Sequence, residues 1–164
     1  MICSTILVDS SALANFGTIE SLTATWRKRR HGRNMLRPTR PSRPVLGWIR
    51  NDEARNAGGR ASEALRAIIC VDHVLGVGAV IVIHHTDCGL THLRNDFLHK
   101  SLTEKAPNNA AEIAKMDFLE ILDLKASVIE DMKILENSPY LRKDLKVYGY
   151  VYDIKTGKLQ DVKG

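Results

Sequence analysis

The strongest hydrophobic pattern lies in the middle of the chain. Apolar residues recur there at helical spacing, at Leu65, Ile68, Ile69 and Leu75. Gly76 ends this pattern, Gly58 and Gly59 form a turn before it, and Ser62 is a suitable helix cap. The run "AVIVI" at 79–83 is continuously apolar, as in a strand that is covered on both faces. A helix followed by a buried strand predicts an α/β layer architecture.

The flanking patterns predict further elements. Residues 108–122 and 123–138 are expected to be helices, the second with one apolar stripe: Leu124, Val128, Met132 and Leu135. Residues 145–154 and 158–162 read as two strands joined by a turn at Thr156 and Gly157. The segment "STILVD" at 4–9 has the pattern of a short strand.

Length and composition are those of a single globular domain. The chain has 164 residues, of which 44% are hydrophobic and 26% charged. No run approaches the roughly 18 apolar residues that a membrane span needs, and the amino terminus does not resemble a secretory signal. We therefore expect a cytoplasmic protein. Its three distant cysteines argue against a disulfide framework.

The charge is unevenly distributed. Nine basic residues and no acidic one lie between Glu20 and Asp52: Arg27, Lys28, Arg29, Arg30, Arg33, Arg37, Arg40, Arg43 and Arg50. We divide the chain into an atypical basic and Pro-rich segment, 1–54, extended or disordered, and an α/β domain, 55–164. Residues 27–50 could contact nucleic acid or an acidic surface. A solvated tail is at least as good an interpretation, because only Trp26 and Trp48 offer stacking surfaces.

Candidate chemistry is concentrated directly after the buried strand, in "IVIHHTDCGL". His85 and Cys88 are three residues apart, and imidazole nitrogen and thiolate are both good zinc ligands. One such pair is a weak signal, and a buried thiol beside a histidine bonded to the backbone is the alternative.

Two other patterns involve cysteine. Cys88 to Arg94 has the Cys-x5-Arg spacing of phosphatase loops, but Asp87 would disfavour the thiolate and only Gly89 allows close backbone approach. In "CVDHV", Cys70 and Asp72 cannot face one ion on a helix. We therefore expect a core Cys70 and a solvated Asp72.

Three separated segments together resemble the β-class carbonic anhydrases of the small, single-domain bacterial and fungal type. These segments are "RNAGGRASEALRAII", "LGVGAVIVIHHTDCGL" and "YGYVYDIKTGKL". The resemblance implies an α/β fold with a mainly parallel β-sheet flanked by helices. It further implies a dimer or higher homo-oligomer with one Zn²⁺ per subunit, and His85 and Cys88 as metal ligands. It also implies that zinc-bound hydroxide converts carbon dioxide to bicarbonate. His84 would then be an outward-facing or supporting neighbour of the ligand strand.

One motif of the family is not found. Its Cys-x-Asp-x-Arg motif supplies a second cysteine ligand and an Asp-Arg pair, whereas this chain has only Cys3 before residue 55, with Thr5 and Leu7 at the other offsets. Cys3 is therefore the candidate third ligand, and the family's catalytic Asp-Arg pair has no counterpart. Without the family's first strand, we expect apolar surface around "AVIVI" to be exposed.

Three functions fit these observations. The first is a carbonic anhydrase whose activity is impaired by the missing motif. The second is a zinc enzyme that acts on carbonyl sulfide, and the third is a catalytically silent relative that dimerises or binds polyanions. The fold alone does not choose among them.

Overall fold

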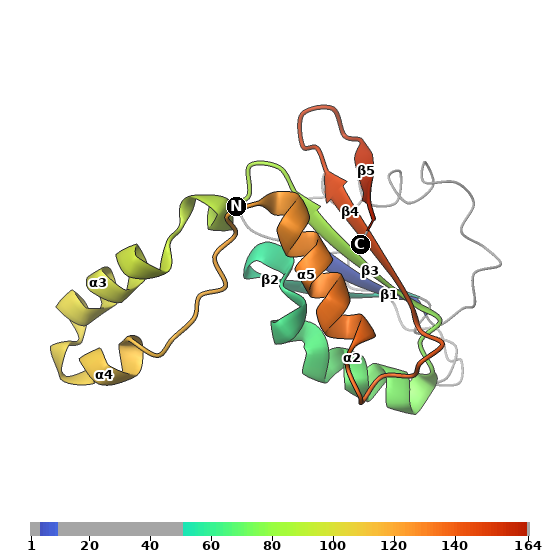
Figure 1. Ribbon diagram of the computed structural model, residues 1–164, viewed down its shortest axis with the longest axis horizontal. Coiled ribbons are helices and arrows are strands. Elements are labelled where there is room, and N and C mark those ends of the chain that lie inside the picture. Colours follow the sequence, from blue (N-terminus) through green and yellow to red (C-terminus); the bar gives the residue numbers. More distant parts are fainter. Residues whose placement is uncertain (1–3, 10–50, 164) are drawn as a thin grey trace, which may run out of the picture.

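A five-stranded sheet organises the part of the chain that the computed structural model describes, residues 4–9 and 51–163 (Figure 1). The strands are β1 (Ser4–Asp9), β2 (Asn51–Asn56), β3 (Ala79–His85), β4 (Lys146–Tyr152) and β5 (Leu159–Val162). The α-helices are α2 (Ala61–Leu75), α3 (Asn95–Lys105), α4 (Ala110–Ile113) and α5 (Leu124–Glu136). Three short 3-10 helices are η2 (Ala57–Gly59), η3 (Gly89–His92) and η4 (Pro107–Asn109).

The sheet is mixed, with strand order β2-β1-β3-β4-β5. Only β3 and β4 pair in parallel; β1 runs antiparallel to both β2 and β3, and β5 runs antiparallel to β4. The α/β class is confirmed, but "mainly parallel" does not describe the pairing of these strands. The physical reason lies in the connections. The long helical crossover after β3 permits a parallel partner, whereas the short turn after β4 forces β5 to return antiparallel.

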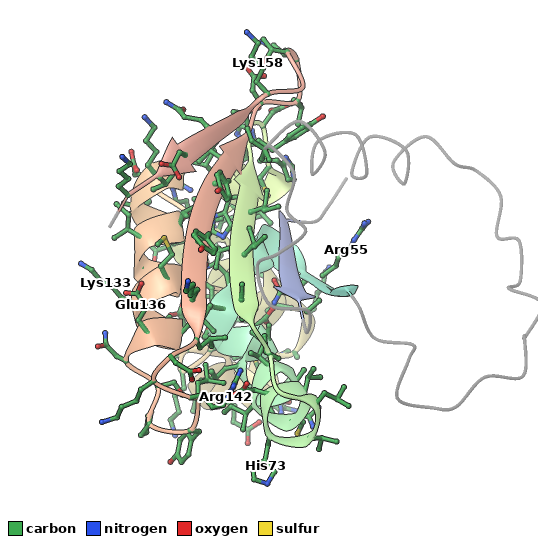
Figure 2. All side chains as sticks on the ribbon, turned by 90° about the vertical axis from the view of Figure 1, so that its right-hand side faces the viewer. Arg55, His73, Lys133, Glu136, Arg142 and Lys158 are labelled. Carbon is green, nitrogen blue, oxygen red and sulfur yellow. The ribbon has the colours of Figure 1, made fainter. Side chains whose placement is uncertain are left out.

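The predicted turn between the last two strands is present. Asp153 organises it, because its backbone exchanges hydrogen bonds with Lys158 and Gly157, and its side chain accepts from the amides of Lys155 and Thr156. These hydrogen bonds lower the pKa of the Asp153 carboxyl below its usual value. Figure 2 shows Lys158 at the tip of this turn, at one end of the sheet.

Helices α2 and α5 cover one face of the sheet. Val80 and Val82 of β3 point into this layer, where they join Ile68, Val128 and Leu135. Ile81 and Ile83 point to the other face and pack with Tyr152. All seven residues of β3 are buried. The expected exposure of "AVIVI" is therefore wrong, because β1 occupies one edge of β3 and β4 the other, while both faces are covered.

The helix predictions are partly confirmed. Helix α5 coincides with the second predicted helix, and Asp123 caps it by accepting from the amide of Ala126 at 2.7 Å. The end of α2 at Gly76 is also confirmed. Its N-cap is Arg60 rather than Ser62, which lies inside the first turn.

Residues 108–122 do not form the predicted helix, and α3 was not predicted. Only Ala110–Ile113 is α-helical in that stretch. Asn95 holds the residues that follow α4 in an extended path, because its side chain accepts a hydrogen bond from the amide of Phe118 and donates one to Asp117. Leu119 then adopts a positive φ of 54°, which no helix accommodates.

Helices α3 and α4 lie side by side on an arm that extends away from the sheet (Figure 1). No residue of α3 is buried; Phe97 of α3 is 62% exposed and Met116, after α4, is 47% exposed. The arm therefore presents apolar side chains that α2, α5 and the sheet do not cover.

Within the described ranges, no helix is long and apolar enough to cross a membrane. The basic residues 27–50, with their suggested polyanion contacts, lie outside the described residues, as does Cys3.

Candidate metal centre

His85 and Cys88 are both placed at the carboxyl end of β3, in the centre of the sheet. His85 is 7% exposed and Cys88 1% exposed. The loop between them is fastened to β4, because the Thr86 amide donates to the Tyr152 carbonyl at 2.9 Å and the Thr86 hydroxyl accepts from the Ile154 amide at 3.0 Å. The two predicted ligands therefore share one sheet edge and one short, anchored loop.

The imidazole of His85 has a defined orientation. Its Nδ1 lies 2.8 Å from the carbonyl oxygen of Thr86. Because a carbonyl oxygen only accepts, Nδ1 carries the proton, and Nε2 is the nitrogen whose lone pair is suited to a metal. A backbone carbonyl behind a histidine ligand is a frequent arrangement in metal sites.

The loop around Cys88 is held by its own backbone. The Cys88 carbonyl accepts from both the amide and the hydroxyl of Thr91, at 3.0 and 2.6 Å. Asp87 adopts a positive φ of 56°, an uncommon conformation that turns the chain between the two candidate ligands. A histidine nitrogen and a buried thiol set in this way form a donor pair suited to zinc.

His84 takes a different environment from its neighbour. It is fully buried and its Nδ1 lies 2.9 Å from the hydroxyl of Ser127 on α5, while Nε2 lies 3.0 Å from Oδ2 of Asp131. The outward-facing alternative for His84 is therefore wrong. His84 instead supports β3 from the face that the helices cover.

The described residues contain only part of a conventional zinc ligand set. Within residues 4–9 and 51–163, no three histidine, cysteine or acidic side chains come together in a way that could hold a metal ion. Cys3, the third ligand suggested by the sequence, lies outside that range. Of the three candidate ligands, His85 and Cys88 are among the described residues.

The Cys-x5-Arg alternative receives no support from the geometry. The guanidinium of Arg94 is exposed, and its Nη1 donates to the carbonyls of Thr91 and Leu93 at 3.0 and 2.9 Å. Arg94 therefore braces its own loop. An arginine used in this way is not arranged to hold a phosphate beside Cys88.

The expectations for "CVDHV" are wrong for both residues named. Cys70 is exposed, whereas Asp72 is only 4% exposed. Asp72 accepts from the Val77 amide and from the Arg142 guanidinium, both at 3.0 Å. Burial alone would raise the pKa of Asp72, but these bonds together hold it below its usual value. Arg142 lies at the end of the sheet opposite Lys158 (Figure 2), so this pair is remote from His85.

Several polar residues around His84 were missed from the sequence. Ser127 and Asp131 are buried on α5, and Arg60, at the start of α2, donates from Nε to Asp131 at 3.2 Å. A usable signal was present, since Ser127 and Asp131 are four residues apart and flank the apolar stripe of α5. A polar pair on a buried helix face requires a partner, but its identity could not be read from local spacing.

Known proteins resemble about two thirds of this chain. No family model matches it. Beta-carbonic anhydrase 1 of Mycobacterium tuberculosis is 28% identical over 125 residues, which cover 72% of each chain. A carbon disulfide hydrolase of Saccharolobus solfataricus is 30% identical over 136 residues, 68% of this chain and 67% of the relative. The solved carbonic anhydrase from Glaciozyma antarctica is 40% identical with a TM-score of 0.62, covering 66% of this chain and 64% of that structure.

Proposed function

Because the chain belongs to the β-carbonic anhydrase family, we propose that it is a zinc-dependent lyase that interconverts carbon dioxide and bicarbonate. The observation that carries this proposal is the pairing of His85 and Cys88 at the end of the buried strand β3, with the Nδ1 proton of His85 directed at a carbonyl. The similarity to carbonic anhydrases supports the reaction, and the donor pair supports the metal.

His85 and Cys88 would hold the zinc through Nε2 and the thiolate. When bound, zinc lowers the pKa of a water ligand towards about 7. The protein's own contribution is to fix the two donors, since Thr86 ties their loop to β4 and both side chains are withdrawn from bulk solvent. A rigid pair of donors needs little reorganisation when the metal binds.

We propose Cys3 as the third ligand. It directly precedes Ser4, where β1 begins, and Thr5 pairs with Ile83 in the antiparallel register of β1 with β3. The start of β1 therefore lies beside the end of β3, because the partner of Thr5, Ile83, is only two residues before His85. Activity below that of a complete family member is expected, because Thr5 and Leu7 stand at the offsets of the family's Asp-Arg pair.

Zinc stoichiometry tests this assignment most directly. We expect about one zinc per chain in purified wild-type protein, measured by atomic emission, and carbon dioxide hydration in a stopped-flow assay. Cys88→Ser, His85→Ala and Cys3→Ser should each lose zinc. Cys70→Ser is the matched control, since Cys70 is an exposed thiol elsewhere, and it should retain zinc and activity.

Two other outcomes would contradict the proposal in whole or in part. Wild-type protein without zinc or hydration activity would refute it and favour a silent relative that binds partners. Full zinc content in Cys3→Ser would refute only the third ligand, after which His31 and a residue of a second subunit would be examined.

The similarity to a carbon disulfide hydrolase favours a second candidate function, hydrolysis of a sulfur analogue of carbon dioxide, such as carbonyl sulfide. The same His85 and Cys88 would serve it. Release of hydrogen sulfide from carbonyl sulfide or carbon disulfide, faster than carbon dioxide hydration by the same preparation, would make this the main activity.

The arm supports assembly as a homodimer or higher homo-oligomer. Phe97 is 62% exposed there and Met116 is 47% exposed, while Leu122, directly before α5, is 74% exposed. Exposed apolar groups of this size are common where a second subunit binds. Sedimentation equilibrium should show a dimer or larger species, and a monomer at micromolar concentration would contradict the assembly.

A further inference from the structure

A buried polar network lies directly behind the candidate metal centre, on the opposite face of β3. His84 and Asp131 are fully buried, and the Arg60 side chain is 5% exposed. Consecutive residues of a strand point to opposite faces, so His84 faces α5 while His85 faces away from it. Whatever fixes His84 therefore also fixes the backbone from which His85 and the Cys88 loop continue.

Both nitrogens of His84 face oxygen atoms that can accept. The Ser127 hydroxyl donates its own proton to the Leu124 carbonyl at 2.9 Å, so its oxygen can accept from His84 Nδ1. Nε2 lies 3.0 Å from Oδ2 of Asp131 and 3.4 Å from the carbonyl of Gly59. Oδ2 of Asp131 makes no hydrogen bond within the described residues, so it is the 3.0 Å approach of His84 Nε2 that couples the ring to Asp131.

Asp131 connects this ring to the rest of the molecule. Its Oδ1 accepts from Arg60 Nε at 3.2 Å, and Arg60 also donates to Glu130 at 2.5 Å and to the Leu119 carbonyl at 3.3 Å. Asp131 thus joins the end of β3 to the start of α2 and, through Arg60, to the base of the arm. Charged groups buried without such partners are strongly unfavourable.

We propose that Asp131 is a positioning residue for the metal centre: by holding His84, it sets the direction from which His85 and Cys88 meet a zinc ion. This inference rests on the proposed function, because it assumes that these two residues bind zinc. Partners behind a ligand typically change metal affinity by 10- to 100-fold. Asp131 acts one residue further back, through the backbone that joins His84 to His85.

The test compares two buried carboxylates in the full-length protein. Asp131→Asn keeps the shape of the side chain and removes its charge. Asp72→Asn makes the same change near the other end of β3, where Asp72 pairs with Arg142. The rise per residue of a strand puts the two ends of β3 about 20 Å apart. Zinc dissociation constants are measured by competition with a chromophoric chelator. Visible spectra are recorded with Co²⁺ in place of zinc, and thermal unfolding is measured on the zinc-free proteins.

We expect both variants to unfold at lower temperature than wild type. Only Asp131→Asn should bind zinc roughly 10- to 100-fold more weakly and shift the Co²⁺ absorption bands. If Asp131→Asn does not fold, Ser127→Ala, which removes only the partner of Nδ1, should show a smaller loss of zinc affinity in the same direction.

The possible failures are distinguishable. Wild-type affinity and spectrum in a folded Asp131→Asn, or in Ser127→Ala where Asp131→Asn does not fold, would overturn the positioning role and leave the proposed function intact. Equal losses of affinity in Asp131→Asn and Asp72→Asn would also overturn it, because general destabilisation would then suffice. Wild-type protein that binds neither metal would overturn the proposed function, and this inference with it.

Discussion

Gly149 allows α5 to approach β4 closely, and Gly149→Ala should therefore destabilise the protein. A methyl group at this position would lie 2.6 Å from Cγ1 of Val128 and still closer to Sδ of Met132. Gly149 is buried and its φ lies outside the left-handed region, so the effect of the substitution is steric.

The magnitude follows from the distances. Ordinary contacts begin near 3.4 Å, so Val128 Cγ1 must move by about 0.8 Å. Met132 can yield by rotation, but Val128 is β-branched, helical and fully buried. Overpacking costs about 1–3 kcal/mol, and replacing glycine in a strand recovers roughly 0.5–1 kcal/mol. Because the rigid Val128 puts the overpacking cost in the upper half of its range, about 2–3 kcal/mol, we expect the free energy of unfolding to fall by roughly 1–2.5 kcal/mol.

Urea unfolding of zinc-free protein, followed by circular dichroism, measures this loss. The cause is tested with Val128→Ala, which alone should cost about 2 kcal/mol but at least about 1 kcal/mol less when Gly149→Ala is present. Gly89→Ala is the control, since a methyl group there meets no atom within 4 Å. Additive effects of the two substitutions, or wild-type stability of Gly149→Ala, would refute the reasoning.

Two other substitutions have different physical origins. The pKa of Asp72 is lowered in the folded state, so the charged carboxylate stabilises the fold above the ordinary aspartate pKa, and this stabilisation is lost as the pH falls from about 5 through the lowered pKa. Thermal unfolding of Asp72→Asn should therefore show lower stability than wild type at pH 7 and a smaller further loss in acid. A pH profile of stability identical to that of wild type would contradict this. Gly58→Ala combines a positive φ of 75° with a collision against the Leu90 side chain. Urea unfolding should therefore show a loss of roughly 2–5 kcal/mol, whereas a loss of only about 1 kcal/mol, the cost of the φ strain alone, would show that Leu90 moves freely.

The elements recovered from the sequence are those whose signals are local. The run at 79–83, the apolar stripe of α5 and the turn at Thr156–Gly157 each combine periodicity with a stop signal, and each occurs in the structure. Where a tertiary contact competes with such a signal, prediction fails. Residues 108–122 have helical composition, but hydrogen bonds from Asn95 hold Asp117 and Phe118 in a different path.

The candidate site divides in the same way. His85 and Cys88 are close in sequence, so their spacing was sufficient to identify the pair. The network behind them joins Arg60, His84 and Asp131, and the Arg60–Asp131 bond spans 71 residues. No local period encodes that contact. Ser127 and Asp131, four residues apart on α5, were not predicted to take part in it, because their partners lie on other elements.

The direction of β1 decides which of its two ends can provide a ligand to the metal centre. In this antiparallel strand, Thr5 pairs with Ile83 near the candidate ligands, whereas Asp9 pairs with Ala79 at the opposite edge. A ligand should therefore come from the residue before β1 and not from its carboxyl end. We expect Cys3→Ser to lose zinc, and a cysteine introduced by Asp9→Cys not to restore it. Recovery of zinc by Asp9→Cys in the Cys3→Ser background would require β1 to run parallel to β3, because only then does position 9 lie near His85.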